Sequence, residues 1–402
     1  MTTLLALLVA VVLVAFVTRF IRVPYTIALV VVGLALGITG GPFQVSLSED
    51  VILTVFLPAL LFEAAYNLPW KHLRAEFRFI SGLAIPGVLV STLVVGAIMH
   101  LAGLAWLVAL LFGALISATD PVSVLAIFKQ LKADRRLATV VEAESLFNDG
   151  TALVIFQILL GVIVAGRVAP LLTGLAFVVS IIGGVAVGAG LGYLTARLLR
   201  TVDDYLIEIT CTLLLAYGTF ILTEHLAVTV QGVRLGASPV IAVVVAGLVI
   251  GNYAAQISMS ETTRAAMDGA WELITYLANS FIFLLIGLQI HRIPIGRGDL
   301  TLIFWAVVSI LVARALIVYG GMVTLNLGQP RPRRFPLRYQ HIVVWGGLRG
   351  AVALAAALSI PDAFVPERAT LLLLTFAIVL FTLLVQGMTI RPLVRWFDRK
   401  PE

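Results

Sequence analysis

The sequence has little charge. Charged side chains make up 12% of its 402 residues, whereas hydrophobic side chains make up 61% and the mean hydropathy is +1.09. A soluble domain carries about 25% charged residues. This balance excludes a soluble protein and predicts an all-α polytopic membrane protein. We expect the lipid bilayer, and no nucleic acid, among its partners.

Cysteine and histidine are also scarce. Cys211 is the single cysteine, which excludes an intrachain disulfide and a cysteine-rich metal site. The five histidines are far apart in the sequence, so we expect no histidine metal site. No loop is long enough for a soluble domain. We also expect no resident cofactor and no enzymatic activity.

Long apolar runs make up most of the chain. A transmembrane helix needs about 20 predominantly apolar residues, and thirteen such spans are predicted. They cover roughly residues 2–20, 24–39, 50–66, 77–102, 104–128, 139–165, 169–198, 204–228, 236–253, 269–291, 299–326, 337–359 and 367–390. We interpret the first span as a retained helix, because it lacks the basic start and the cleavage site of a signal peptide.

The 27 Lys and Arg residues are distributed unevenly among the loops. Twenty follow odd-numbered spans or lie in the C-terminal tail, five follow even-numbered spans, and Arg314 and Arg349 lie within spans. Cytoplasmic loops are enriched in these residues. The bias predicts an external N-terminus and a cytoplasmic C-terminus, in a plasma membrane. Arg314 could pair with an acid or cap a helix end, and the sequence does not identify its partner.

The sixth span carries an unusual polar cluster. Residues 142–150 contain three carboxylates, a hydroxyl and a carboxamide, and the residues that follow are mostly apolar. On a helix, an arc of roughly 140° would hold Glu144, Ser145, Asn148 and Asp149. A charged residue at mid-bilayer costs about 2.5–3.5 kcal/mol on insertion scales. This face is therefore predicted to line protein or a water-filled cavity.

The fifth span is predicted to break. Pro121 removes a backbone donor and clashes with the preceding turn, directly after Thr119 and Asp120. Free backbone groups inside a membrane are tolerated where they line a cavity or contact a ligand. A break with added side-chain oxygens therefore indicates an ion site.

The twelfth span contains a second weak segment. Gly346, Gly347 and Gly350 surround Arg349, and each glycine weakens a helix by about 1 kcal/mol relative to alanine. Arg349 stays protonated and needs an anion. Glu144 and the aspartates are the candidates.

These two breaks lie seven spans apart. If spans one to six and eight to thirteen are two repeats, the broken spans are the fifth helix of each. The odd shift gives the two repeats opposite topology. Paired interrupted helices in inverted repeats indicate a transport site near the membrane midplane.

The same segments resemble a known family. Residues 119–121, 144–149 and 346–350 are similar, in order and spacing, to signature segments of the sodium/proton exchangers. This is the NhaP/NHE-type branch of the monovalent cation:proton antiporters. Residues 61–63 and 279–287 also look like family segments. The resemblance spans nearly the whole chain, and the short tail resembles that of prokaryotic members.

The resemblance implies a fold of thirteen helices in two inverted six-helix repeats with crossed broken helices. It implies interface helices in residues 1–66 and 201–298, core helices in residues 67–166 and 299–402, and a connecting helix in residues 167–200. It also implies a homodimer.

The resemblance assigns the transported ions to specific residues. Asp149 would carry both the cation and the proton. Na⁺ would be bound with the help of Asp120, Ser145 and the backbone of Thr119, with Glu63 nearby through water. Family members with an Asn-Asp pair here are typically electroneutral.

Other polar residues would support this site. The resemblance implies that Glu144 pairs with Arg349 and holds Asn148 in place. Glu142 lies seven residues before Asp149 on the same helix face, and we expect it in a cytoplasmic funnel.

The residues by themselves favour exchange of a monovalent cation for H⁺. Carboxylate, hydroxyl and carbonyl oxygens suit Na⁺ and Li⁺, and K⁺ stays open. Asn148 cannot ionise, so the Asn148–Asp149 pair carries one titratable charge, which favours one-for-one exchange. A cation channel would need a ring of identical motifs. An intramembrane aspartyl protease would need both a Tyr-Asp and a Gly-x-Gly-Asp motif, and the sequence contains no Tyr-Asp.

Overall fold

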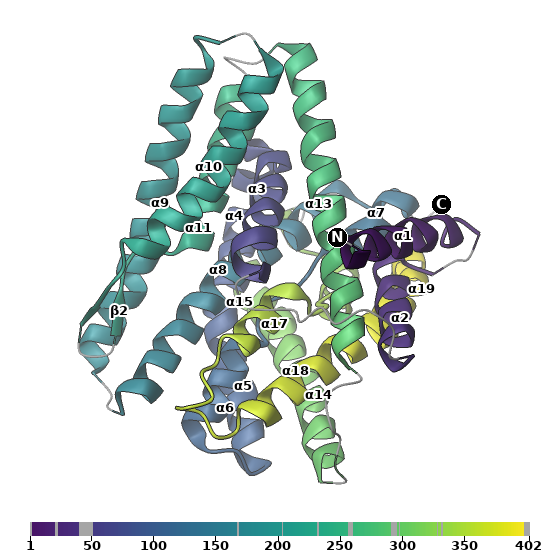
Figure 1. Cartoon of the computed structure of the whole chain (residues 1–402). Coiled ribbons are helices and arrows are strands. Elements are labelled where there is room, and N and C mark those ends of the chain that lie inside the picture. The colour runs from purple at the N-terminus through teal and green to yellow at the C-terminus, as the bar shows by residue number, and fades with distance from the viewer. Residues whose placement is uncertain are drawn as a thin grey trace.

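The computed structural model is almost entirely helical (Figure 1). It describes residues 2–20, 23–39, 51–166, 169–202, 204–230, 233–255, 260–290, 296, 298–327, 329–330 and 333–397. The helices of the first half are α1 (Thr2–Val17), α2 (Tyr25–Ile38), α3 (Leu57–Asn67), α4 (Trp70–Ala84), α5 (Pro86–Leu101), α6 (Trp106–Leu115), α7 (Val122–Leu131), α8 (Arg135–Ala165) and α9 (Pro170–Leu199).

The second half continues in the same way. Its helices are α10 (Tyr205–His225), α11 (Pro239–Val249), α13 (Glu261–Ile290), α14 (Asp299–Ala315), α15 (Gly321–Asn326), α16 (Leu337–Trp345), α17 (Ala351–Leu358), α18 (Arg368–Phe381) and α19 (Gly387–Phe397). Short π-helical segments extend several of them: η1 (Val51–Phe56), η2 (Ile250–Ala254), η3 (Leu316–Gly320) and η5 (Thr382–Gln386).

Each predicted span coincides with one helix or with consecutive helices. Seven of the described helices are long and apolar enough to cross a membrane, and shorter apolar helices account for most of the other spans. The predicted all-α polytopic fold is therefore confirmed.

Some predicted boundaries were wrong. The fourth span begins at Trp70 rather than residue 77, and α13 begins at Glu261 rather than residue 269. A count of apolar residues finds the part of a helix that lies in the apolar layer of a membrane. The helix itself can continue beyond that layer for as long as its backbone hydrogen bonds continue. An antiparallel pair of strands, β1 (Val228–Val230) and β2 (Val233–Leu235), was not predicted.

Both predicted breaks are present, and they contact each other. The fifth span is divided between α6 and α7, and the twelfth between α16 and α17. The backbone N–H of Asp120, in the first break, donates a hydrogen bond of 2.8 Å to the carbonyl of Leu348 in the second. Backbone groups freed in one broken helix are thus satisfied by the other.

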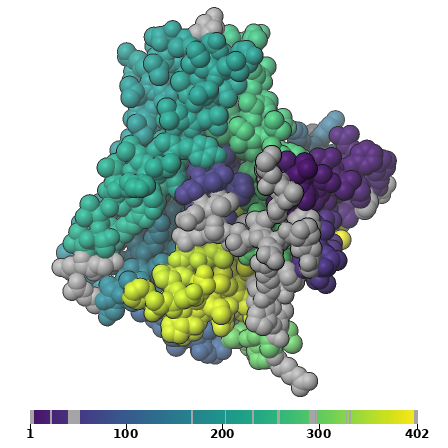
Figure 2. Space-filling model, in the orientation of Figure 1, coloured from purple at the N-terminus to yellow at the C-terminus, as the bar shows by residue number. Residues whose placement is uncertain are grey.

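Helices α9, α10 and α11 pack against one another, and α3 packs against α10 and α11 (Figure 1). The described residues between 170 and 289, teal to green in Figure 2, form a large part of one face of the molecule. Glycines allow close approach within this group. A Cβ at Gly184 would meet the side chain of Ile241, and a Cβ at Gly188 would meet the backbone of Ala242.

This packing predicts opposite effects for two glycines of α9. Gly188→Ala should destabilise the protein by about 1–3 kcal/mol, because the added methyl group overpacks the α9–α11 contact. Gly190 has nothing within 4 Å of an added Cβ, so Gly190→Ala should be neutral or stabilising by up to about 1 kcal/mol. Thermal unfolding in detergent measures both changes, and equal losses would contradict the packing argument.

Candidate functional site

Helix α8 presents its polar residues on two neighbouring faces. It begins after Asp134, whose carboxylate accepts a hydrogen bond from the backbone N–H of Arg136. Glu142, Ser145 and Asp149 recur at helical spacing and line one cavity. Glu144 and Asn148 are one turn apart, buried, and hydrogen-bonded to each other. The polar arc predicted from the sequence is therefore present.

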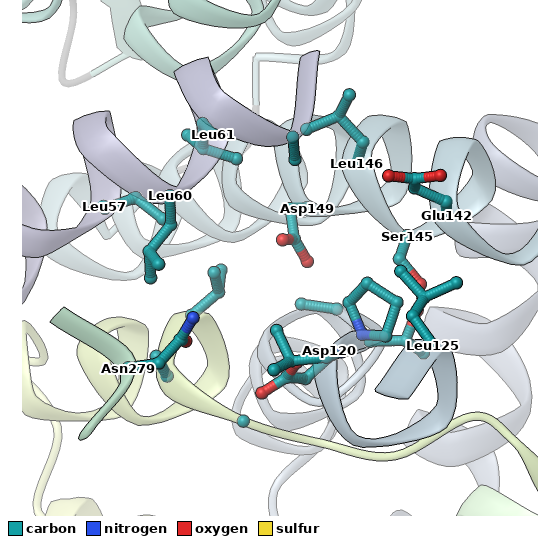
Figure 3. A pocket seen from close by; sticks show the side chains of 18 of the residues that line it. Leu57, Leu60, Leu61, Asp120, Leu125, Glu142, Ser145, Leu146, Asp149 and Asn279 are labelled. Atoms are coloured by element: carbon teal, nitrogen blue, oxygen red, sulfur yellow. The ribbon is translucent and has the colours of Figure 1, made fainter. Parts of the chain in front are cut away.

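A cavity of about 140 Å³ collects most of the predicted ion-site residues (Figure 3). Its walls come from α3, α8, α13, α17 and the break before α7. The polar residues that line it are Glu63, Thr119, Asp120, Glu142, Ser145, Asp149 and Asn279. Pro121 and Gly350, from the two breaks, line it as well. The chain thus brings residues from distant segments to one cavity.

Asp149 points into this cavity from α8, with Asp120 and Asn279 on other walls (Figure 3). Its side chain is buried, and its Oδ1 atom has no hydrogen-bond partner in the described part of the chain. A buried carboxylate oxygen without a hydrogen-bond partner destabilises the fold. It is therefore a ready ligand for a cation or a proton.

Oxygen atoms from the first break lie beside Asp149. The hydroxyls of Thr119 and Ser145 are 2.9 Å apart and share one hydrogen bond. The Oδ1 atom of Asp120 accepts a hydrogen bond of 2.9 Å from the backbone N–H of Val122, which caps α7. Hydroxyl and carboxylate oxygens of this kind are the ligands that a small hard cation prefers.

Asn148 connects the break to α8. Its amide donates to the hydroxyl of Thr119 at 2.7 Å and to Glu144 at 2.9 Å, and its carbonyl oxygen accepts from the backbone N–H of Thr119 at 3.2 Å. These bonds satisfy every group of a buried carboxamide except one acceptor position. They hold the unwound segment at a fixed distance from α8.

Glu144 forms a bidentate ion pair with Arg314 of α14. The Nη1 and Nη2 atoms of the arginine donate to the two carboxylate oxygens at 2.7 and 2.9 Å, and Nε donates to the carbonyl of Val343 at 3.3 Å. Both side chains are almost fully buried. Such fork geometry is among the strongest hydrogen-bonded arrangements in proteins.

Comparisons with known proteins agree with this architecture. The family model described as sodium/hydrogen exchanger, transmembrane, matches residues 5–396. The Na⁺/H⁺ antiporter NhaG of Bacillus atrophaeus is 43% identical over 93% of this chain and 70% of its own length. The Na⁺/H⁺ antiporter NhaP of Pseudomonas aeruginosa is 40% identical over 94% of this chain and 92% of its own length.

The chain belongs to the sodium/hydrogen exchanger family. Its fold is similar to that of the sodium proton antiporter MjNhaP1 from Methanocaldococcus jannaschii, with a TM-score of 0.78, 21% identity and coverage of 100% of this chain and 99% of that one. The resemblance found in the sequence motifs is thus confirmed at the level of the family and the fold.

One predicted contact of this exchanger-family chain is wrong. Glu144 pairs with Arg314 and not with Arg349. The guanidinium of Arg349 donates instead to the carbonyl of Gly347 at 2.7 Å, and its backbone N–H donates to Thr382 at 3.1 Å. Arg349 remains within Coulombic reach of Glu144, Asp149 and Arg314, without a carboxylate in direct contact among the described residues.

The glycines of the second break leave room for these groups. A Cβ at Gly350 would collide with the carboxylate of Asp120, and one at Gly347 would come within 2.8 Å of the Nε atom of Arg314. A Cβ at Gly346 would meet the carbonyl of Ile342 at 2.9 Å. The glycines of this weak helical segment therefore also make space for an acid and an arginine.

The sequence reasoning missed two residues of the site. Arg314 was recognised as a charge within a span, but its partner was left open. Asn279 lines the cavity from α13, and it begins the segment 279–287 that resembles the family. Its carboxamide among apolar neighbours was the signal that could have identified it.

The two arginines should differ in their coupling to Glu144. Arg314→Met should destabilise the protein by about 3–5 kcal/mol, because it leaves a buried carboxylate unpaired. The added change Glu144→Gln should recover part of this loss. In the matched cycle, Arg349→Met and Glu144→Gln should show much weaker coupling.

Chemical or thermal unfolding of the three single and two double variants in detergent measures both coupling energies. Stronger coupling of Glu144 to Arg349 than to Arg314 would contradict the ion pair described above.

Proposed function

We propose that the protein is a secondary antiporter that exchanges either Na⁺ or Li⁺ for H⁺ across the membrane. The observation that carries this proposal is the cavity at the meeting point of two broken helices. It holds the buried carboxylate of Asp149, one oxygen of which has no hydrogen-bond partner among the described residues. Membership of the sodium/hydrogen exchanger family supports the same activity.

In this proposal, Na⁺ binds between Asp149 and the first break. Asp149 and Asp120 supply carboxylate oxygens, Ser145 supplies a hydroxyl, and Thr119 supplies a backbone carbonyl. The three side-chain ligands line one cavity with Thr119, which supports a shared site. K⁺ is larger and would need a wider cavity, so Na⁺ and Li⁺ are the proposed substrates.

Exchange follows from competition for Asp149. A proton bound to its carboxylate removes the negative charge that attracts the cation, and a bound cation occupies the oxygens that would accept the proton. Each ion therefore displaces the other. If the loaded site reaches either side of the membrane and the empty charged site does not, the competition produces coupled antiport.

The charges around the site support one-for-one exchange. The carboxylates Asp120, Glu144 and Asp149 and the guanidiniums of Arg314 and Arg349 form one cluster. When all are ionised, the cluster has one excess negative charge. One Na⁺ or one H⁺ neutralises it equally, so both loaded states carry the same charge and the cycle moves no net charge.

Glu63 and Glu142 line the same cavity without contacting an arginine in the part of the chain that is described. Glu63 accepts a hydrogen bond of 2.7 Å from Asn67. We assign Glu142 to the cytoplasmic approach to the site and Glu63 to water-mediated contact with the cation. Two acids near the path would raise the local concentration of cations.

Alternating access requires two bodies that move relative to each other. We assign residues 67–166 and 299–402 to a transport core and residues 1–66 and 201–298 to an interface unit, joined by residues 167–200. The interface unit would hold a homodimer together. The Lys and Arg distribution supports an external N-terminus and a cytoplasmic C-terminus in a prokaryotic plasma membrane.

Asp149→Asn should abolish cation/proton exchange while leaving the fold intact. The amide keeps the shape of the carboxylate but binds neither a proton nor a cation with charge. Exchange is measured as proton movement driven by a Na⁺ gradient in proteoliposomes, and folding as thermal unfolding. Asp362→Asn is the control, because that side chain is 82% exposed and does not line the cavity. If the Asp149→Asn variant exchanged ions at the wild-type rate, Asp149 would not be the carboxylate that carries the cation and the proton.

The exchange should also be insensitive to membrane potential. Clamping the potential with K⁺ and valinomycin should leave the initial rate of Na⁺-driven proton movement unchanged, because neutral loaded states feel no field. A rate that changes with the imposed potential would contradict one-for-one exchange. Na⁺ conduction without proton movement would contradict antiport itself and favour a channel.

A further inference from the structure

A second and larger cavity lies behind the ion site. Its volume is about 670 Å³, within the range of about 300–1,000 Å³ that is typical of small-molecule sites. Its walls come from α4 and α8 on one side and from α9, α11 and η2 on the other. The lining is mostly apolar, and nothing in the sequence motifs or the family assignment explains it.

The wall from α8 is the back of the turn that carries Asp149. Phe147 and Thr151 lie one helical turn apart and face this cavity, whereas Asp149 faces the ion cavity. Helix α4 adds a stripe at helical spacing, from Trp70 through Phe77 to Ala84. An occupant would therefore contact the helix that holds the proposed carrier.

The opposite wall is closely packed. Helices α9 and α11 meet at Gly184 and Gly188 without space for a Cβ. Trp70 and Phe77 of the α4 wall are 53% and 52% exposed, and Val185 of α9 is 44% exposed. The cavity is thus a wedge between two packed groups of helices. It opens to the surface of the molecule at Trp70, Phe77 and Val185.

One end of the wedge is basic. Arg200 donates to the phenol of Tyr253, which lines the cavity, at 3.2 Å. Arg197 lies over the ring of Tyr193, 5.4 Å from its centroid, and the rings of Tyr193 and Tyr253 are 5.7 Å apart. These two arginines are exposed.

The α4 side of this end is basic as well. Arg74 is exposed and lies one turn from both Trp70 and Phe77 on the α4 stripe. Within the described ranges, no carboxylate pairs with Arg74, Arg197 or Arg200. These exposed guanidinium groups lie next to an apolar wedge, and together they match a ligand with an anionic head and an apolar tail.

We propose that this wedge binds one acyl chain of an anionic phospholipid, whose phosphate lies at Arg74 and Arg200. The proposed orientation puts this end in the cytoplasmic leaflet, where anionic lipids are found. Lipid tails are as apolar as leucine, so the chain gains little from leaving the bilayer. The headgroup charge must therefore select this lipid over a neutral one.

Native mass spectrometry of delipidated protein in detergent tests the proposal, with dioleoyl phosphatidylglycerol and dioleoyl phosphatidylcholine as probes. One phosphatidylglycerol molecule should bind more tightly than phosphatidylcholine. Arg200→Gln should weaken its binding about fivefold, the effect of one basic residue near an anionic lipid. Val245→Phe should abolish the preferred site, because the larger ring fills the wedge from α11.

Matched controls separate the wedge from the general lipid shell. Val178→Phe enlarges an exposed residue of α9 that does not line the cavity, and Arg395→Gln removes an exposed arginine of α19. Both should bind phosphatidylglycerol like the wild type. If Val245→Phe fails to fold, Ser81→Leu fills the wedge from α4 instead.

Equal affinity for the two lipids, or equal losses in the control variants, would mean ordinary annular lipid and would overturn the proposal. This readout is a binding measurement that needs no transport. A failure here leaves the antiport proposal intact, and a failure of antiport in proteoliposomes leaves the lipid site intact.

Discussion

A buried ion pair between Glu144 and Arg314 supports the proposed ion site. Each charge has lost its hydration and is stabilised chiefly by the opposite charge of the other. The carboxylate also accepts from Asn148, which in turn holds Thr119 at the break of the fifth span. Removing the arginine would release this whole sequence of contacts. This salt bridge therefore helps to fix the unwound segment and the proposed cation ligands, together with the backbone hydrogen bond from Asp120 to Leu348.

Helix α8 contacts a different part of the protein on each of three faces. Asp149 faces the small ion cavity, Glu144 faces the arginine of α14, and Phe147 faces the apolar wedge. The first two faces keep a charged site rigid. The third borders a gap between two groups of helices, where the rearrangement proposed for alternating access would meet little resistance from packing.

Much of the site could be predicted from local patterns. Pro121 and the glycines around Arg349 predict broken helices because they act on their own backbone. The polar arc of Glu144, Asn148 and Asp149 follows from helical periodicity alone. The partner of Glu144 could not be predicted in this way, since Arg314 and Arg349 were equally suitable in charge and both lay within apolar spans. The difference is geometric, because the Arg349 guanidinium turns back onto the carbonyl of Gly347.

The sequence by itself determined that this is a helical membrane protein with two broken spans, a polar helix face and a charge bias across the membrane. Each of these features arises from the composition and spacing of neighbouring residues. Only the tertiary structure decided that the two breaks meet at Asp120 and Leu348, that Arg314 is the arginine paired with Glu144, and that an apolar wedge lies behind Asp149. These features join segments that are distant in the chain, and no local pattern encodes which of them come into contact.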